Sequence, residues 1–158
     1  MEIHRIRNDA LDMATDSKRA KKKLKVILDS NALFVPLQFK IDIFEELKTL
    51  LSVKFELVVL SPIRRELEII AEAGSPKMCK LASYALKLAE KCVFFEVEKE
   101  KAALSPDDVI VEMAKRWNCP VFTNDRELRK KLRNISLPVI YVRQKSRLEI
   151  DGRIQFPV

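Results

Sequence analysis

Glycine and histidine are scarce in this chain. The 158 residues include only two glycines, Gly74 and Gly152, and one histidine, His4. Dinucleotide-binding and Walker A loops need several glycines at fixed spacing, so both are excluded. His4 lies in a polar N-terminal stretch. A catalytic triad, a Cys–His pair or a histidine metal site would have to be built on that one residue, and we do not expect one.

Paired cysteines and long apolar runs are also lacking. Cys79, Cys92 and Cys119 are odd in number and have no Cys-x-x-Cys spacing. Such cysteines are typical of buried, reduced thiols in a cytoplasmic protein. No apolar run approaches the roughly 20 residues of a membrane-spanning helix. The N-terminal residues lack the apolar core of a signal peptide. We therefore expect a cytoplasmic protein with no membrane contact.

Positive charge gathers in two segments. Residues 1–25 hold eight basic and four acidic side chains, a net of +4 out of the chain's +7. A basic tail by itself is as compatible with a solvated extension as with nucleic-acid binding. A second basic segment, residues 143–147, favours a polyanionic partner. The candidate contacts are Lys18, Arg19, Lys21, Lys22 and Lys23 in the first segment, and Arg143, Lys145 and Arg147 in the second.

Short apolar runs alternate with helical patterns along the chain. The pattern predicts strands at 25–28, 57–60, 93–97, 120–123 and 138–142, and helices at 39–51, 62–73, 76–91, 106–117 and 125–133. Ser61 and Ser105, each followed by proline, are the predicted N-caps of two helices. Continuous apolar strands alternating with helices are typical of a parallel sheet with helices on both faces. We expect an α/β three-layer sandwich of about five strands over residues 25–150, with a basic extension at 1–24 and a tail at 151–158.

Acidic side chains follow four of these predicted strands. In open α/β sheets, functional sites form beyond the carboxyl ends of the strands. Asp29 comes directly after the first strand, and Asp125 comes just after the fourth. The helices that follow the second and third strands carry Glu66 and the pair Asp107–Asp108 near their starts. We therefore expect these acids to meet at one edge of the sheet.

Helical phase separates the inward acids from the outward ones. A helix advances about 100° per residue, so Glu66 lies about 60° from the apolar position Ile63. Glu68 points away from that buried stripe. By the same rule Asp107 lies about 60° from Ile110 and Asp108 about 160° from it. The phase therefore predicts that Glu66 and Asp107 face the sheet edge.

Each acid taken alone also has an ordinary structural explanation. Acids in a first helical turn are stabilised by the helix dipole, and Asp29, Asn124 or Asp125 would make normal helix caps. Several carboxylates gathered in one crevice, however, repel one another. An oxygen-only cluster suits a hard cation, Mg²⁺ or Mn²⁺. Such ions hold phosphate oxygens and generate hydroxide. An acidic metal site on a basic protein indicates a nuclease.

The body of the chain resembles a PIN-domain ribonuclease in five ordered runs: VILDSNALFVPLQFKIDIFEEL, SPIRREL, SPDDVIVEMA, VFTNDRELRKKLR and PVIYVRQKSRLEI. The resemblance covers about residues 25–150. It is greatest to the archaeal branch that includes VapC-like toxins and relatives of the Fcf1-type endonuclease of ribosomal-RNA processing. It implies a sheet of order 3-2-1-4-5 and an acidic site that binds Mg²⁺ or Mn²⁺. The residues that match the catalytic and metal-binding acids are Asp29, Glu66, Asp107 and Asp125, with Asn31, Thr123 and Asp108 as supporting residues.

The expected function is a divalent-metal-dependent endoribonuclease, either toxin-type or rRNA-processing. The alternative is a PIN-fold RNA-binding or assembly factor with little or no cleavage activity. A receiver domain or a phosphohydrolase is disfavoured because Asp29-Ser30-Asn31 lacks the Asp-x-Asp start and the acid pair that those proteins use. The expected partners are RNA, an antitoxin or a ribosome-assembly factor, and a second copy of the chain through an apolar face that includes Tyr84 and Leu88.

Overall fold

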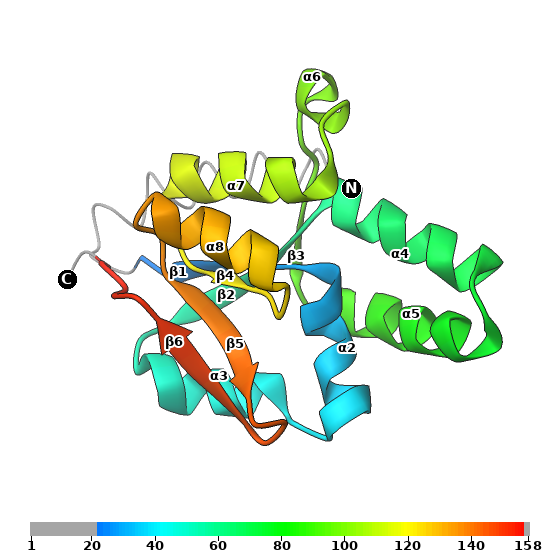
Figure 1. The fold of residues 1–158 in the computed structure, drawn as a ribbon, viewed down its shortest axis with the longest axis horizontal. Helices are drawn as coiled ribbons and strands as arrows, with labels where there is room; N and C mark the ends of the chain where they lie inside the picture. The colour runs from blue at the N-terminus through cyan, green and yellow to red at the C-terminus, as the bar shows by residue number, and fades with distance from the viewer. Residues whose placement is uncertain (1–21, 157–158) are drawn as a thin grey trace.

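A mixed six-stranded sheet forms the centre of the protein (Figure 1). The computed structural model describes residues 22–156, so the predicted RNA contacts Lys18, Arg19 and Lys21 lie outside the described residues. The strand order is β3-β2-β1-β4-β5-β6. The strands are β1 (Leu24–Leu28), β2 (Phe55–Leu60), β3 (Val93–Phe95), β4 (Val121–Phe122), β5 (Val139–Arg143) and β6 (Arg147–Asp151).

The first five strands are parallel and follow the expected order 3-2-1-4-5. The antiparallel sixth strand, β6, was not predicted. Only Leu148 of β6 is buried, and charged residues occupy three of its five positions. Such a pattern is typical of an edge strand, whose outer side needs no apolar cover. The predicted α/β sandwich is confirmed, with one edge strand added.

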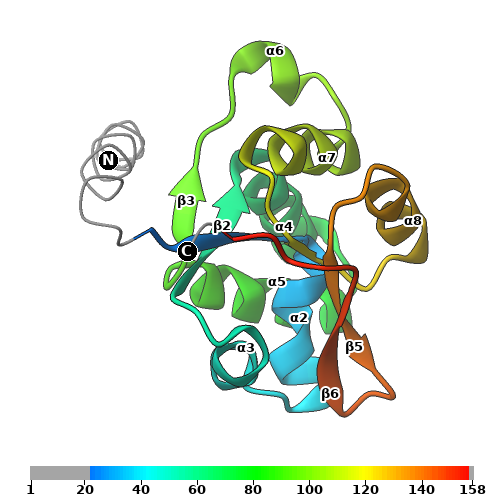
Figure 2. The same cartoon turned by 90° about the vertical axis from the view of Figure 1, so that its left-hand side faces the viewer.

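Helices cover both faces of the sheet. Figure 2 shows α7 and α8 on one side, and α2, α3 and α5 on the other. The helices are α2 (Ser30–Phe39), α3 (Ile43–Leu51), α4 (Ser61–Ala73), α5 (Pro76–Ala89), α6 (Lys99–Ala102), α7 (Pro106–Trp117) and α8 (Arg126–Asn134). None of the helices within residues 22–156 has both the length and the apolar character to cross a membrane.

Helix α2 was missed by the sequence pattern, which predicted one helix over 39–51. Residues 32–35 of α2 are all buried. A helix that is apolar all round shows no helical period, and Pro36 inside it is a residue that normally interrupts helices. The chain leaves α2 at Lys40, which has a left-handed φ of 56°. The predicted helix is therefore shorter, beginning at Ile43 with Asp42 as its cap.

Of the two predicted serine caps, Ser105 is confirmed and Ser61 is wrong. Ser105 caps α7 as expected, since its side chain accepts from the Asp108 N–H at 3.2 Å. Ser61 does not cap α4, whose N-cap is Leu60 without a side-chain bond. The Ser61 hydroxyl instead accepts from the Val97 N–H at 3.0 Å. Ser61 thus ties the segment after β3 to the end of β2.

The pairing of β1 with β4 brings two polar segments together. Ile27 lies opposite Val121 and Leu28 opposite Phe122, in parallel register. All four side chains are fully buried. Because parallel strands end at the same edge of a sheet, the residues that follow β1 and β4 are neighbours.

Replacing Leu33 of α2 by alanine should destabilise the protein by about 2–5 kcal/mol, because the side chain is fully buried and its removal leaves a cavity. Leu37→Ala in the same helix is the matched control, since that leucine is 37% exposed and should lose less than about 1 kcal/mol. Urea unfolding measures both changes. Equal losses in the two variants would show that α2 does not pack as described.

Candidate active site

Asp29 is a buried carboxylate at the end of β1, with only 4% of the residue exposed. Its Oδ1 accepts a hydrogen bond from the Ser30 N–H at 2.8 Å and so caps α2. Its Oδ2 accepts from the Thr123 hydroxyl at 2.7 Å and from the Asn31 amide at 3.0 Å. Asp29 is therefore a helix cap and also part of a wider polar network. The role as a helix cap is thus observed, and the expected role in metal binding stays a prediction.

The network continues across the ends of β4 and β5. The fully buried Thr123 accepts from the Asp125 N–H at 3.1 Å while it donates to Asp29. Asn31 Oδ1 accepts from the Asn124 N–H at 2.9 Å. Asn124 Oδ1 accepts from the Val142 N–H, on β5, at 2.8 Å. The structure thus places both expected supporting residues, Asn31 and Thr123, in contact with Asp29. It adds Asn124, which the sequence indicated only as a candidate cap.

Asp125 caps helix α8. Its Oδ1 accepts from the Glu127 and Leu128 N–H groups, at 2.8 and 3.4 Å. Among residues 22–156, no hydrogen bond reaches its Oδ2. One carboxylate oxygen is therefore fixed by the helix, and the other remains available to a cation.

The remaining two expected acids lie as helical phase predicts. Glu66 on α4 and Asp107 on α7 are half-buried, whereas Glu68 and Asp108 are exposed. Asp108, expected as a supporting residue, instead has its backbone N–H bound to the cap of α7. The structure thus brings Glu66 and Asp107, and not their outward neighbours, toward the sheet edge.

Electrostatics show that the four acids share one environment. Burial raises the pKa of Asp29, the hydrogen bonds from Thr123 and Ser30 oppose that rise, and the negative charges of Glu66 and Asp125 add to it. The pKa of Asp107 is also raised, first by burial and then by the charges of Asp29 and Asp125. Each of these carboxylates is therefore within electrostatic reach of others from distant parts of the chain.

The donor set fits a hard cation. The four expected ligands are all carboxylates, and oxygen ligands suit Mg²⁺, Mn²⁺ or Ca²⁺ better than softer metals. Within the part of the chain that the structure describes, no three acids, histidines or cysteines stand close enough to form a ready-made coordination shell. The residues that would hold an ion are Asp29, Glu66, Asp107 and Asp125.

Comparison with known proteins decides the family. A family model described as a PIN like domain matches residues 26–145. Ribonuclease VapC4 of Methanocaldococcus jannaschii is 36% identical over 131 residues, which cover 82% of this chain and 98% of that relative. The chain belongs to the PIN-like domain family. The resemblance inferred from the five sequence runs is thereby confirmed.

Two further relatives of this PIN domain cover nearly its whole body. Ribonuclease VapC9 of Archaeoglobus fulgidus is 28% identical over 139 residues, covering 88% of this chain and 98% of the relative. A solved structure of the PIN domain endonuclease Utp24 superposes with a TM-score of 0.66 at 28% identity. That match covers 85% of this chain and 96% of the other.

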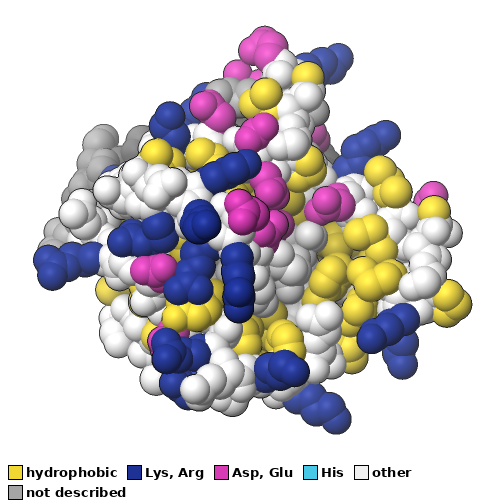
Figure 3. All heavy atoms as spheres, viewed as in Figure 1, with side chains coloured by type: hydrophobic (Ala, Val, Ile, Leu, Met, Phe, Trp, Pro, Cys, Tyr) yellow, Lys and Arg dark blue, Asp and Glu magenta, His cyan; other side chains and the backbone are white. Residues whose placement is uncertain are grey.

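The acidic cluster of the PIN domain opens onto a surface with basic side chains beside it. Figure 3 shows acidic side chains gathered near the middle of one face, with lysine and arginine next to them. An open groove of about 800 Å³ begins beside Glu66, between α4 and β3, and Arg65, Phe94 and Leu104 are among its lining residues. Of the four acids only Glu66 lines this groove, and its outward neighbour Glu68 lines it as well.

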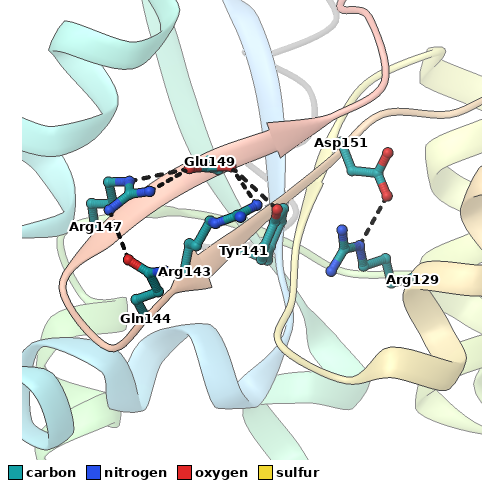
Figure 4. A network of polar contacts seen from close by, with 7 residues as sticks. All are labelled: Arg129, Tyr141, Arg143, Gln144, Arg147, Glu149 and Asp151. Atoms are coloured by element: carbon teal, nitrogen blue, oxygen red, sulfur yellow. Dashed lines mark hydrogen bonds and ion pairs between the residues drawn. The ribbon is translucent and has the colours of Figure 1, made fainter.

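The basic hairpin of the PIN domain is more neutral than its sequence suggests. Arg143 and Arg147 both bind Glu149, at 3.3 and 3.1 Å, and Tyr141 donates to the same carboxylate at 3.3 Å (Figure 4). Lys145 is exposed at the turn, and Lys22 and Lys23 are exposed before β1. The role of these lysines as RNA contacts stays a prediction. Arg143 and Arg147 are weaker candidates for RNA contacts, because they share one acid, Glu149.

Thr123→Val should lower the free energy of unfolding by about 1–3 kcal/mol, because a buried carboxylate and a backbone N–H each lose a hydrogen-bond partner. Thr123→Ser keeps the hydroxyl and should lose only the contacts of one methyl group, about 1 kcal/mol. Thermal or urea unfolding of the two variants measures the difference. If serine were no better than valine, the hydroxyl would not be what holds Asp29.

Asp107→Asn should stabilise the metal-free PIN domain at neutral pH. A raised pKa means that the folded state binds the proton more tightly, so wild-type stability falls as pH rises from the ordinary value of 3.8 through the raised one. The amide side chain of the Asp107→Asn variant does not ionise, so it removes this loss of stability. The gain should be below about 1 kcal/mol because Asp107 is half-exposed and screened.

The control for this test is Asp108→Asn. Both acids lie in the first turn of α7 and share its dipole, so their difference isolates the cluster. Unfolding is measured in chelator at pH 7 and near pH 3, where protonation should abolish the gain. An equal response of the two variants would show that Asp107 is not held against the other acids.

Proposed function

We propose that this PIN domain is an endoribonuclease that hydrolyses RNA phosphodiester bonds with the help of a divalent cation. The observation that supports the proposal is the charge coupling of Asp29 with Glu66 and Asp125, and of Asp107 with Asp29 and Asp125, from four separate segments of the chain. Mutual repulsion makes such a gathering unfavourable unless positive charge is supplied. The relatives support this reading, since two are named ribonucleases and one an endonuclease.

The residues of the site divide the work. Asp29 is held by three donors from Ser30, Asn31 and Thr123, so it offers a fixed anchor. Asp125 keeps one oxygen on the α8 backbone, and its other oxygen would be available to a cation. Asp107 and Glu66 approach from α7 and α4 and complete the negative wall around a reacting phosphate.

A divalent cation bound by these acids would coordinate the phosphate oxygens and lower the pKa of the attacking water. We propose Mg²⁺ or Mn²⁺, because all the candidate ligands are oxygen atoms. Asn31 and Thr123 would help to hold such an ion by fixing the Asp29 carboxylate, as outer partners commonly do at metal sites.

The biological setting that fits this activity is either a toxin-type or an rRNA-processing nuclease in the cytoplasm. The first setting predicts an antitoxin as partner and the second a ribosome-assembly factor. A second copy of the chain remains the predicted occupant of the α5 face with Tyr84 and Leu88, both of which are half-buried. A PIN fold that binds RNA without cutting it is the alternative that the following experiment excludes or establishes.

Cleavage of a structured RNA should require Mg²⁺ or Mn²⁺ and should fall by at least about a hundredfold in Asp29→Asn, Asp107→Asn and Asp125→Asn, because each change removes a charged ligand. Asp108→Asn and Glu68→Gln, the outward neighbours, should retain most of the activity. Gel analysis of product formation measures the rates, with circular dichroism as the check on folding.

Two results would contradict the proposal or its choice of residues. Wild-type protein that binds RNA but leaves it intact with either ion would establish the non-cleaving alternative. Equal losses at Asp107 and Asp108 would show that helical phase does not distinguish the functional acid of α7.

A further inference from the structure

Helix α8 is the most basic element among residues 22–156. Its nine residues include five cations and one acid, and only Leu128 and Leu132 are buried. A single apolar pair is enough to seat the helix on the sheet, so the excess of cations on it is not explained by packing. The five cations are Arg126, Arg129, Lys130, Lys131 and Arg133.

Two of the five cations are committed to the fold. Arg129 binds Asp151 at 3.0 Å and lies 3.8 Å over the ring of Tyr141 (Figure 4). Arg133 binds the same carboxylate at 3.2 Å and donates to the Leu137 carbonyl at 3.2 Å. These contacts fasten α8 to β5 and β6. They face the sheet edge that lies away from α7.

The other three cations, Arg126, Lys130 and Lys131, are exposed. Among the described residues, none of them has an ion pair or a hydrogen bond from its side chain. Arg126 and Lys130 are four residues apart, so their like charges repel on one side of the helix, and Lys131 lies about 140° round the helix from Arg126. These three residues define what we call the free face of α8.

The free face of α8 adjoins the acidic cluster. Arg126 directly follows Asp125, the cluster acid that caps the helix. Helical phase turns Lys131 about 160° from Arg129, and so away from β5 and β6 and toward α7. The positive charge of Lys131 partly opposes the rise in the pKa of Asp107, the α7 member of the cluster. Arg126, through its neighbour Asp125, and Lys131, through its charge on Asp107, therefore lie beside the cluster, and Lys130 is exposed one residue before Lys131.

A cluster of acids repels the phosphates that a nuclease must hold, so cations beside it are needed to bring RNA within reach. The hairpin arginines are a weaker choice, because both share Glu149. We propose that the free face of α8, formed by Arg126, Lys130 and Lys131, binds the RNA backbone next to the acidic cluster. This inference rests on the proposed nuclease function and names the surface that its substrate uses.

The test is the triple variant Arg126→Ala/Lys130→Ala/Lys131→Ala, in which alanine preserves the helix. The matched control is Lys77→Ala/Lys80→Ala/Lys87→Ala on α5. That control also removes three exposed lysines from one helix, and none of them has an ion pair among the described residues. Binding of a labelled RNA hairpin is measured in chelator over a series of salt concentrations, which separates binding from cleavage.

Wild type and the α5 control should bind alike. The α8 variant should lose on the order of tenfold or more in affinity at low salt. The slope of its log affinity against log salt should fall by about 2 to 3, since each of three phosphate contacts contributes roughly 0.7 in a single strand and 0.9 in a duplex. Cleavage at subsaturating RNA should fall in step.

Equal slopes for the α8 variant and the α5 control would overturn the inference. So would a loss of affinity confined to Arg143→Ala/Lys145→Ala/Arg147→Ala, which would assign the RNA to the β5–β6 hairpin. Wild-type protein that binds RNA through α8 but never cleaves it with Mg²⁺ or Mn²⁺ would support the surface and refute the proposed nuclease. The two claims therefore fail separately.

Discussion

The hydrogen bond from the Thr123 hydroxyl to Asp29, 2.7 Å long, joins the ends of the two central strands of the sheet. Parallel pairing of β1 with β4 sets these residues side by side, and the apolar strands on which they stand leave little freedom. A buried carboxylate is tolerated only if it is hydrogen-bonded. Thr123, Asn31 and Ser30 meet that need, and so they fix the position around which the other acids gather.

Acidic side chains lie close to Asp29, and basic side chains lie farther out on α8. The charges of these acids raise the pKa of Asp29 and Asp107. The cations of α8 lie beside these acids. Asp151 on the added edge strand binds two arginines of that helix, which holds the helix in place and leaves its other cations for a ligand. A protein of net charge +7 can thus bring a polyanion to a negative site, and the functional proposal depends on that contrast.

The sequence predicted the parts of this protein that follow from period and strand ends. The alternation of strands and helices, the position of Asp29 and the inward phase of Glu66 are of this kind, whereas the strand order was implied by the family resemblance. What it did not predict depends on tertiary contacts. Helix α2 is apolar all round and contains Pro36, so it has no readable period. Strand β6 is an exposed edge. Ser61 looks like a cap, but its hydroxyl binds the N–H of Val97. The free face of α8 could not be predicted, because it depends on the ion pairs of Asp151 with Arg129 and Arg133.

The central claim is that acids from distant segments act as one cation site, and Mn²⁺ binding to the metal-free protein tests it most directly. Titration followed by calorimetry or by the Mn²⁺ electron paramagnetic resonance signal gives the affinity without any RNA. The account predicts saturable binding that weakens by at least about tenfold in Asp29→Asn and in Asp107→Asn, and that is retained in Asp108→Asn. Undiminished Mn²⁺ binding by a folded Asp29→Asn protein would contradict it.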